Sequence, residues 1–388
     1  MRPLEGVFVL DFSTLLPGPM ATLLLAEAGA EVVKVERPGR GEEMRAYELS
    51  WGAGSANFAL LNRGKRSVAL DLKDPEARTR LAPLLARADV LVEQFRPGVM
   101  ARLGLGYDAV SAANPGVIYC SITGYGQTGP KRDLAGHDLN YIGDAGLLAL
   151  SMGPPASPVV PPALVADIGG GTYPAVVNIL LALQERGRTG RGRHLDIAMT
   201  ENLFPFAFWA LGSGLAAGRW PGNGDGLLSG GTARYHLYPT RDGACLAAAP
   251  IEQKFWEAFC EVIGLEPHLR RDRDDPAATL RRVAEIIAGQ DAAVWRARFA
   301  GRDCCCTVVA GLEAAVRDPH FLARGVFRHA LVNERGDTVP ALPVPIDPAF
   351  RGPPEHPLRA PGLGADNEYF MCATPKLPRR AEPEEKPR

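Results

Sequence analysis

The sequence predicts an α/β protein with a large Rossmann-like domain on a parallel sheet and a smaller α+β domain. Within the first 125 residues, apolar runs of strand length alternate with stretches of helical pattern, as in parallel βαβ units. A glycine-dense connection at 218–231 separates this part from a region with a hairpin and several helices. The 388 residues also exceed the usual size of one domain.

The first βαβ unit begins with the apolar run 7–11, which predicts a strand. The turn LLPGPM follows, then a helical pattern that ends at Gly29, and the strand EVVKVE at 31–36. No GxGxxG follows the first strand, so an ordinary dinucleotide site is not expected. The same alternation continues with predicted strands at 67–72, 90–93 and 117–122 and predicted helices at 75–88, 99–103 and 107–114.

The second half of the chain begins with the apolar helical pattern 174–186 and the basic glycine loop GRTGRGR. A strand at 194–198, a helix at 202–215, a hairpin at 235–246 and helices at 254–264, 276–288 and 291–300 are expected next. We therefore predict a large domain at 1–220, a small α+β domain at 221–328, an extended segment at 329–373 that returns to the large domain, and a disordered tail at 374–388.

The charge balance, the apolar runs and the cysteine content exclude several classes of protein. Forty-three basic and forty-four acidic side chains give a formal charge of −1, so no global basic field is available for nucleic acid or an anionic membrane surface. No signal peptide and no membrane-spanning apolar run are recognised. Seven cysteines, three of them consecutive at 304–306, without a CxxC pair indicate reduced thiols and no zinc site. We expect a cytoplasmic protein without a metal ion.

Three residues are candidates for chemistry. Asp167 precedes three glycines at a predicted helix start, where a carboxylate can act as a helix cap or face a ligand beside bare backbone N–H groups. His137 lies in a predicted loop, where histidine is commonly structural but is also suited to proton transfer at neutral pH. Glu252 follows an apolar strand and precedes a helix, which it can simply cap.

The chain resembles the family III CoA-transferase superfamily, which includes CoA-transferases and α-methylacyl-CoA racemase. The matching strings occur in order along the chain: LDFSTLLPGPMAT, AEVVKVERPG, LNRGKRSVALDLK, VEQFRPGVMARLGLGYD, GYGQTGP, GHDLNY, ADIGGG and GRTGRGRHLDIAM. The resemblance implies an acyl-CoA substrate, no cofactor beyond the coenzyme A that this substrate carries, and an interlocked homodimer.

Binding and catalytic roles follow from the same resemblance. It implies coenzyme A contacts at Arg37, Lys65, Phe95 and Arg102 and at the backbone near Leu15 and Leu16. Arg37 follows a predicted strand, Lys65 lies in a turn that precedes one, and Arg102 lies in the predicted short helix 99–103. Ligands of α/β sheets collect at such carboxyl-end and loop positions, and guanidinium groups suit phosphates. Phe95 can stack on adenine or fill the core.

Two reactions remain open, with a non-catalytic CoA-binding protein as a third reading. In a racemase, His137 and Asp167 would act on one face of the α-carbon and Glu252 on the other, with the amides of Gly169 to Gly171 near the enolate oxygen. In a transferase, Asp167 would be a nucleophile that carries CoA as a thioester. The racemase is favoured by GHDLNY and PIEQKFW, and by Ser-Gly-Gly-Thr at 229–232 in place of a transferase-type glycine loop.

Overall fold

The computed structural model describes residues 2–154 and 156–371. Contacts divide the described chain into two compact units: unit 1 comprises residues 2–142, 163–203 and 320–371, and unit 2 comprises residues 143–154, 156–162 and 204–319. The boundaries differ from the predicted ones because residues 143–162 and 204–220 belong with the small unit. Backbone Gly224 N donates to Leu150 O at 2.7 Å, and Met152 N donates to Asn223 Oδ1 at 2.9 Å.

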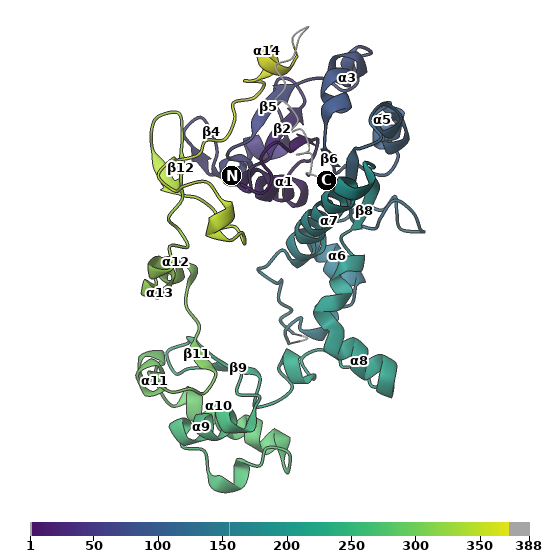
Figure 1. Cartoon of the computed structure of the whole chain (residues 1–388). Coiled ribbons are helices and arrows are strands. Elements are labelled where there is room, and N and C mark those ends of the chain that lie inside the picture. Colours follow the sequence, from purple (N-terminus) through teal and green to yellow (C-terminus); the bar gives the residue numbers. More distant parts are fainter. Residues whose placement is uncertain (1, 155, 372–388) are drawn as a thin grey trace, which may run out of the picture. The chain divides into compact units, whose positions relative to one another are not determined.

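Unit 1 is built on a parallel sheet of six strands in the order β5-β2-β1-β6-β7-β8. Strands β2, β5, β6 and β8 of this sheet are labelled in Figure 1. Every neighbouring pair is parallel, as predicted. The chain moves outward from β1 in one direction and then from β6 in the other, so the strand order reverses between these two strands. The carboxyl ends of strands at such a switch point are where α/β sheets bind ligands. The strands are β1 (Phe8–Asp11), β2 (Glu31–Glu36), β5 (Arg66–Ala69), β6 (Val90–Glu93), β7 (Ile118–Thr123) and β8 (His194–Ala198).

The helices of unit 1 cover this sheet. Helix α1 has all eleven residues buried because it contacts β1, β2 and β6 as well as α2 and α7, and Pro17 at its start needs no helical N–H partner. The helices are α1 (Pro17–Glu27), α2 (Ala56–Asn62), α3 (Ala77–Arg87), α4 (Val99–Arg102), α5 (Tyr107–Ala113), α6 (Asp138–Asp144), which runs two residues into unit 2, and α7 (Tyr173–Thr189), preceded by the π-helical turn η3 (Val165–Thr172). The short strands β3 (Ser50–Trp51) and β4 (Gly54–Ser55), like α2, were not anticipated.

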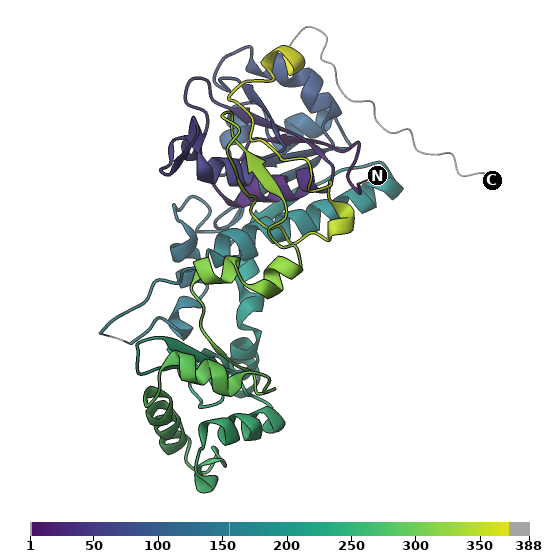
Figure 2. The ribbon, with the colours of Figure 1, turned by 90° about the vertical axis from the view of Figure 1, so that its left-hand side faces the viewer.

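The C-terminal part of the described chain returns to unit 1, as predicted (Figure 2). Its hairpin of β12 (Ala330–Val332) and β13 (Thr338–Pro340) is followed by α14 (Asn367–Phe370) beside β5. Asp366 accepts a hydrogen bond from Ser67 N at 2.9 Å, so the returning segment is fixed to the sheet edge. The predicted disordered tail lies outside the described residues.

Unit 2 contains the antiparallel sheet β11-β10-β9 and its helices. The predicted hairpin is formed by β9 (His236–Pro239) and β10 (Cys245–Ala248), and β11 (Cys306–Val308) pairs with β10. The predicted helix at 202–215 is divided into the 3-10 turn η4 (Glu201–Ala207), which contains Pro205, and α8 (Phe208–Ala217). The remaining helices are α9 (Gln253–Ile263), α10 (Pro276–Ala288), α11 (Ala292–Phe299) and α12 (Leu312–Val316), and α13 (Pro319–Ala323) leads back to unit 1.

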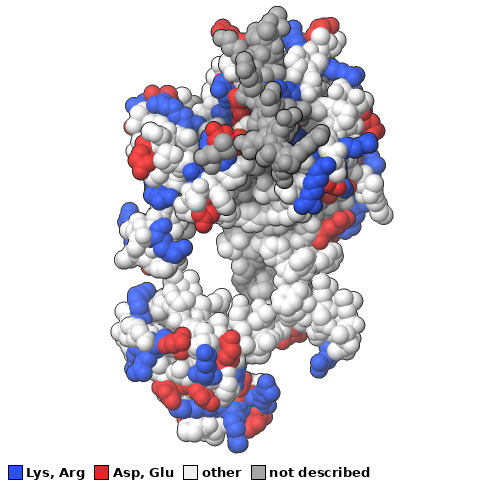
Figure 3. Space-filling view, in the orientation of Figure 1, with Lys and Arg blue, Asp and Glu red and all other residues white. Residues whose placement is uncertain are grey.

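Surface and helix composition add two observations. Basic and acidic side chains are interspersed on the face shown in Figure 3.

Among the described residues, the helical stretch Val165–Thr189 is long and apolar enough to cross a membrane by length and composition alone. It contacts β7 and β8 and buries Ala175, Ile179 and Ala182, which is the pattern of a helix packed on a sheet.

Candidate active site

A cavity of about 490 Å³ lies in unit 1 at the switch point of the sheet. The turn after β1 contributes Leu15, Leu16 and Pro17, the loop after β6 contributes residues 94–97, and the end of β7 contributes residues 122–124. His137 and Asp167 line the same cavity, although they are thirty positions apart in the sequence. The structure therefore brings together two of the three predicted catalytic residues.

The GHDLNY motif forms a compact helix start beside this cavity. His137 N donates to Asn140 Oδ1 at 3.0 Å, and Tyr141 Oη donates to Gly136 O at 2.5 Å. A Cβ atom at position 136 would lie 2.7 Å from the Tyr141 ring, which explains the glycine. These contacts hold the backbone of His137 at the cavity wall and leave its imidazole exposed.

Asp138 holds the backbone of the Asp167 turn. Its Oδ1 atom accepts hydrogen bonds from Ala166 N at 2.7 Å and from Asp167 N at 3.0 Å. Asp138 is 6% exposed, so this contact is internal. Asp138 therefore supports the backbone at Asp167.

The half-buried Asp167 carboxyl has an altered acidity. Burial and then the charge of Asp138 raise its pKa to about 6, while the nearby His137 acts in the opposite direction. A carboxyl group with a pKa close to neutrality can both accept and release a proton under physiological conditions.

The glycines after Asp167 serve packing, whereas their amides were expected to lie near the enolate oxygen. A Cβ at Gly170 would lie 2.3 Å from Met199 O, and one at Gly171 would lie 3.0 Å from Pro17 Cβ. Both glycines are buried, and no residue of 169–171 is among those that line the cavity. Asp167 also lies inside the π-helical turn η3, so it is not the N-cap of α7. The structure thus gives no support to enolate stabilisation by the amides of this turn.

A second cavity of unit 1, of about 300 Å³, adjoins the first at Phe95, which lines both. Arg37 lines it from the end of β2, and its guanidinium contacts Gly41 O at 2.6 Å and the exposed Glu43 carboxylate at 3.1 Å. Phe95 is half-buried and packs against the core, and stacking on adenine stays a prediction. The exposed Lys73 also lines this cavity and was not anticipated, although it directly follows the predicted strand 67–72.

Two of the cations predicted to contact coenzyme A, Lys65 and Arg102, do not line either cavity. Lys65 lies in the turn before strand β5, as expected, but its ammonium group is fully buried and donates to Asp11 at 3.1 Å, to Pro19 O at 2.8 Å and to Asn62 at 2.8 Å. Because all three partners are internal, Lys65 is not presented to a ligand, which corrects that prediction. Arg102 is exposed at the end of α4 and does not line either cavity, although Val99 and Leu103 of the same segment line the second.

Glu252 belongs to unit 2, at the start of α9. Its exposed side chain makes no capping hydrogen bond, so the structure does not use it as a helix cap. Arg234, which sequence reasoning missed, holds the surrounding loop through Ile251 O at 3.1 Å and Gln253 Oε1 at 2.8 Å. The Glu252 carboxylate is therefore available for contact outside its own loop.

The remaining candidate groups are cysteine thiols and possible metal ligands. The six cysteines within the described residues are unpaired, with Cys304 buried and Cys305 exposed. Among residues 2–154 and 156–371, no group of three or more histidine, cysteine, aspartate or glutamate side chains could hold a metal ion.

Comparison with known proteins places the chain in a family. A family model described as CoA-transferase family III matches residues 4–367. The chain belongs to CoA-transferase family III. It is accordingly an enzyme of a family that contains racemases and CoA-transferases.

Individual relatives include both reaction types. The chain is 35% identical to human alpha-methylacyl-CoA racemase over 377 residues, which cover 95% of this chain and 92% of the relative. It is 33% identical to a succinate–glutarate CoA-transferase of Agrobacterium fabrum over 98% of both chains. A crystal structure of a CAIB/BAIF family protein from Brucella suis superposes with a TM-score of 0.77 at 29% identity, covering 94% of this chain and 97% of that one. Sequence identity alone does not separate the two reactions.

Proposed function

We propose that this family III enzyme exchanges the α-proton of an acyl-CoA thioester and so racemises a 2-methylacyl-CoA. One observation carries the proposal: His137 and Asp167 face one cavity, and the Asp167 carboxyl has a pKa of about 6. A nucleophile needs only the carboxylate, whereas a proton-transfer site benefits from a second titratable group beside it. The human racemase among the relatives supports the same reading.

The proposed chemistry starts with the acidity of a thioester α-hydrogen. The His137–Asp167 pair removes this proton and leaves an enolate, which takes up a proton on its opposite face. The family resemblance assigns this second transfer to Glu252. For the other enantiomer the roles are reversed. Arg96, an exposed cation that lines the cavity, supports binding of the negatively charged enolate.

The binding of the coenzyme A part is assigned to the second cavity. Arg37 and Lys73 supply cations for phosphates, and Phe95 supplies an apolar ring at the junction with the first cavity. The reacting thioester would then extend past Leu15 and Leu16 toward Asp167. This placement retains the predicted roles of Arg37, Phe95, Leu15 and Leu16, and it replaces Lys65 with Lys73.

A homodimer is part of the proposal. The outer side of α7 exposes Val177, Leu180 and Leu181, and a helical segment of unit 2 separately exposes Phe206 and Phe208. Exposed apolar groups of this size are typical of surfaces that pair with another chain. The interlocked arrangement that the sequence resemblance implies would cover them. We also propose a cytoplasmic location, consistent with the free thiols of the described residues.

The decisive experiment is incubation with 2-methylacyl-CoA in heavy water, with deuterium at the α-carbon measured by mass spectrometry. The wild type should incorporate deuterium, and Asp167→Asn should not. Asp133→Asn, which changes a highly exposed carboxylate of the 131–136 loop, serves as the matched control and should behave as wild type. Absence of exchange in the wild type would overturn the racemase proposal.

CoA transfer is the second candidate, favoured by the transferase relatives and by the position of the Asp167 carboxylate at the cavity wall. In that reaction the carboxylate attacks the thioester carbonyl and releases the CoA thiolate, which then forms an aspartyl-CoA thioester and frees the acid. Hydroxylamine trapping at Asp167, together with transfer of CoA to an added carboxylic acid, would select this reaction.

A further inference from the structure

The turn that joins β1 to α1, residues 12–17, has an unusual backbone. Leu15 has φ +62°, in the left-handed region that bulky side chains rarely adopt. Such a conformation persists only where surrounding contacts enforce it, and it is concentrated at functional sites. We call residues 12–17 the Leu15 turn.

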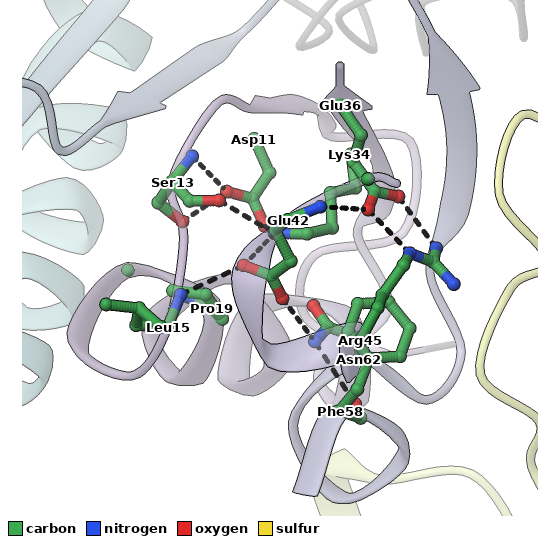
Figure 4. Close-up of polar contacts among 12 residues, drawn as sticks. Asp11, Ser13, Leu15, Pro19, Lys34, Glu36, Glu42, Arg45, Phe58 and Asn62 are labelled. Atoms are coloured by element: carbon green, nitrogen blue, oxygen red, sulfur yellow. Dashed lines mark hydrogen bonds and ion pairs between the residues drawn. The ribbon is translucent and has the colours of Figure 1, made fainter. Parts of the chain in front are cut away.

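Glu42 provides the contact at Leu15 itself (Figure 4). Its Oε2 atom accepts a hydrogen bond from Leu15 N at 2.9 Å, and the same oxygen lies 3.5 Å from the Lys34 ammonium group. Its other oxygen accepts from Asn62 Nδ2 at 3.4 Å. Glu42 is 3% exposed, so both oxygens are satisfied by donors inside the protein.

Lys34 and Asp11 hold Ser13, two positions before Leu15 in the same turn. The Lys34 ammonium group donates to Ser13 O at 2.7 Å, and Asp11 accepts from Ser13 N at 2.9 Å. Lys65 pairs with Asp11 at 3.1 Å. Two lysines and two carboxylates thus form a buried, charge-balanced cluster, and a single neutralisation would leave a buried charge without its partner.

The Leu15 turn is part of both cavities. Leu15 and Leu16 line the cavity that contains Asp167, and Ser13 and Thr14 line the second cavity. The turn is also joined to the segment of Asp167, because Thr172 Oγ1 donates to Pro17 O at 2.8 Å. A change in its backbone would therefore move the wall along which the thioester is proposed to lie.

We propose that Glu42 is a positioning residue: its carboxylate, charge-paired with Lys34, holds Leu15 in the left-handed conformation and so shapes the wall between the two cavities. The inference rests on the proposed function only in naming acyl-CoA as the ligand of that wall. Glu42 also lines the second cavity, but its carboxylate oxygens face Leu15 N, Lys34 and Asn62, so the proposal gives it no contact with substrate.

The first test is independent of any ligand. Both Glu42 oxygens face donors, and glutamine offers only one acceptor, so Glu42→Gln must turn its NH₂ group toward another donor. Hydrogen exchange of the peptide that contains Leu15 should become at least tenfold faster. Unchanged protection would overturn the proposal.

The matched control is Glu27→Gln, near the far end of α1. Glu27 is 5% exposed and is held by Arg63 at 2.7 Å and Arg351 at 2.9 Å, so its neutralisation also disturbs a buried ion pair. This variant should lose thermal stability without faster exchange at Leu15 and without loss of CoA affinity. If Glu42→Gln shows the same pattern as Glu27→Gln, Glu42 has only a general structural role.

The second test measures CoA binding by calorimetry. Glu42→Gln should weaken CoA binding about tenfold, and the effect should be smaller in a Leu15→Gly background because glycine adopts positive φ without steric cost. An equal effect in both backgrounds would contradict the proposal.

If Glu42→Gln does not fold, Glu42→Asp is the second variant. It retains the charge toward Lys34 but reaches less far toward Leu15 N, so it should show the same faster exchange. Failure of the wild type to bind CoA would overturn the proposed function and leave the exchange result intact.

Discussion

Replacing Asp138 with asparagine tests the electrostatics of the candidate site directly. Asparagine can retain the oxygen that accepts from Ala166 N and Asp167 N, so the turn should keep its geometry while one negative charge disappears. The Asp138 charge is the second cause of the raised pKa of Asp167, after burial. Removing the charge should therefore lower the pKa of Asp167 and shift the acidic limb of the pH–rate profile to lower pH.

The size of the effect has a calculable limit. With a pKa of about 6, roughly one tenth of the Asp167 side chains are ionised at pH 5. A return to the ordinary pKa near 3.8 would ionise almost all of them, so the gain at pH 5 cannot exceed about tenfold. Because burial persists in Asp138→Asn, the midpoint should move only part of the way toward the ordinary value, and the gain at pH 5 should stay below this tenfold limit.

The assay is the initial rate of deuterium incorporation between pH 4.5 and 8, compared with wild type at each pH. Asp133→Asn is the control, since it removes a charge from the same segment at an exposed position and is not among the causes of the Asp167 shift. An acidic limb that stays at its wild-type position in Asp138→Asn would refute the electrostatic reasoning.

Three further predictions concern proton transfer by Glu252, the second cavity of unit 1 and the buried cluster that contains Asp11. Glu252→Gln should slow racemisation at least 100-fold without weakening CoA binding, and a normal racemisation rate measured by chiral chromatography would exclude Glu252 as a proton donor. Lys73→Ala should weaken CoA binding several-fold at low salt and leave a pantetheine thioester without the nucleotide unaffected, which titration calorimetry can compare. Burial opposes ionisation of Asp11, but Lys34, Lys65 and two hydroxyl donors more than offset it and hold its pKa below the usual range. The stability that the ionised Asp11 contributes is therefore present above the unfolded-state pKa of about 3.9 and is lost as the pH falls below it. Asp11→Asn should make the melting temperature less dependent on pH in this acidic range. The same variant should lower the free energy of unfolding at pH 7 by about 3–5 kcal/mol.

The predictions from local patterns succeeded where a segment's own residues decide its structure. The strands at 31–36, 90–93 and 194–198 and the helix at 276–288 were located with their observed bounds. The helix predicted at 202–215 was wrong in its first half because apolar periodicity was given more weight than the proline at position 205.

At the candidate site, residue types were predictable and the directions of side chains were not. Asp167 and His137 could be selected because unusual motifs surround them, and both line one cavity. Lys65 and Lys73 both lie beside the β5 region, yet one ammonium group is enclosed by Asp11 and its neighbours and the other side chain is exposed. Two of the three partners of Lys65, Asp11 and Pro19, lie 54 and 46 positions away, so the residues next to the two lysines do not by themselves decide these outcomes.

The sequence by itself determined the parallel α/β architecture, the family motifs and the identity of the carboxylate at the cavity, because apolar periodicity and turn residues act over a few positions. Only the tertiary structure decided that the glycines after Asp167 pack against Met199 and Pro17, that Asp138 supports Asp167, and that Glu42 holds the Leu15 turn. Each of these roles depends on a hydrogen bond or close contact between segments brought together by the fold, and the free energy of a buried polar group is set by its partner rather than by its neighbours in the chain.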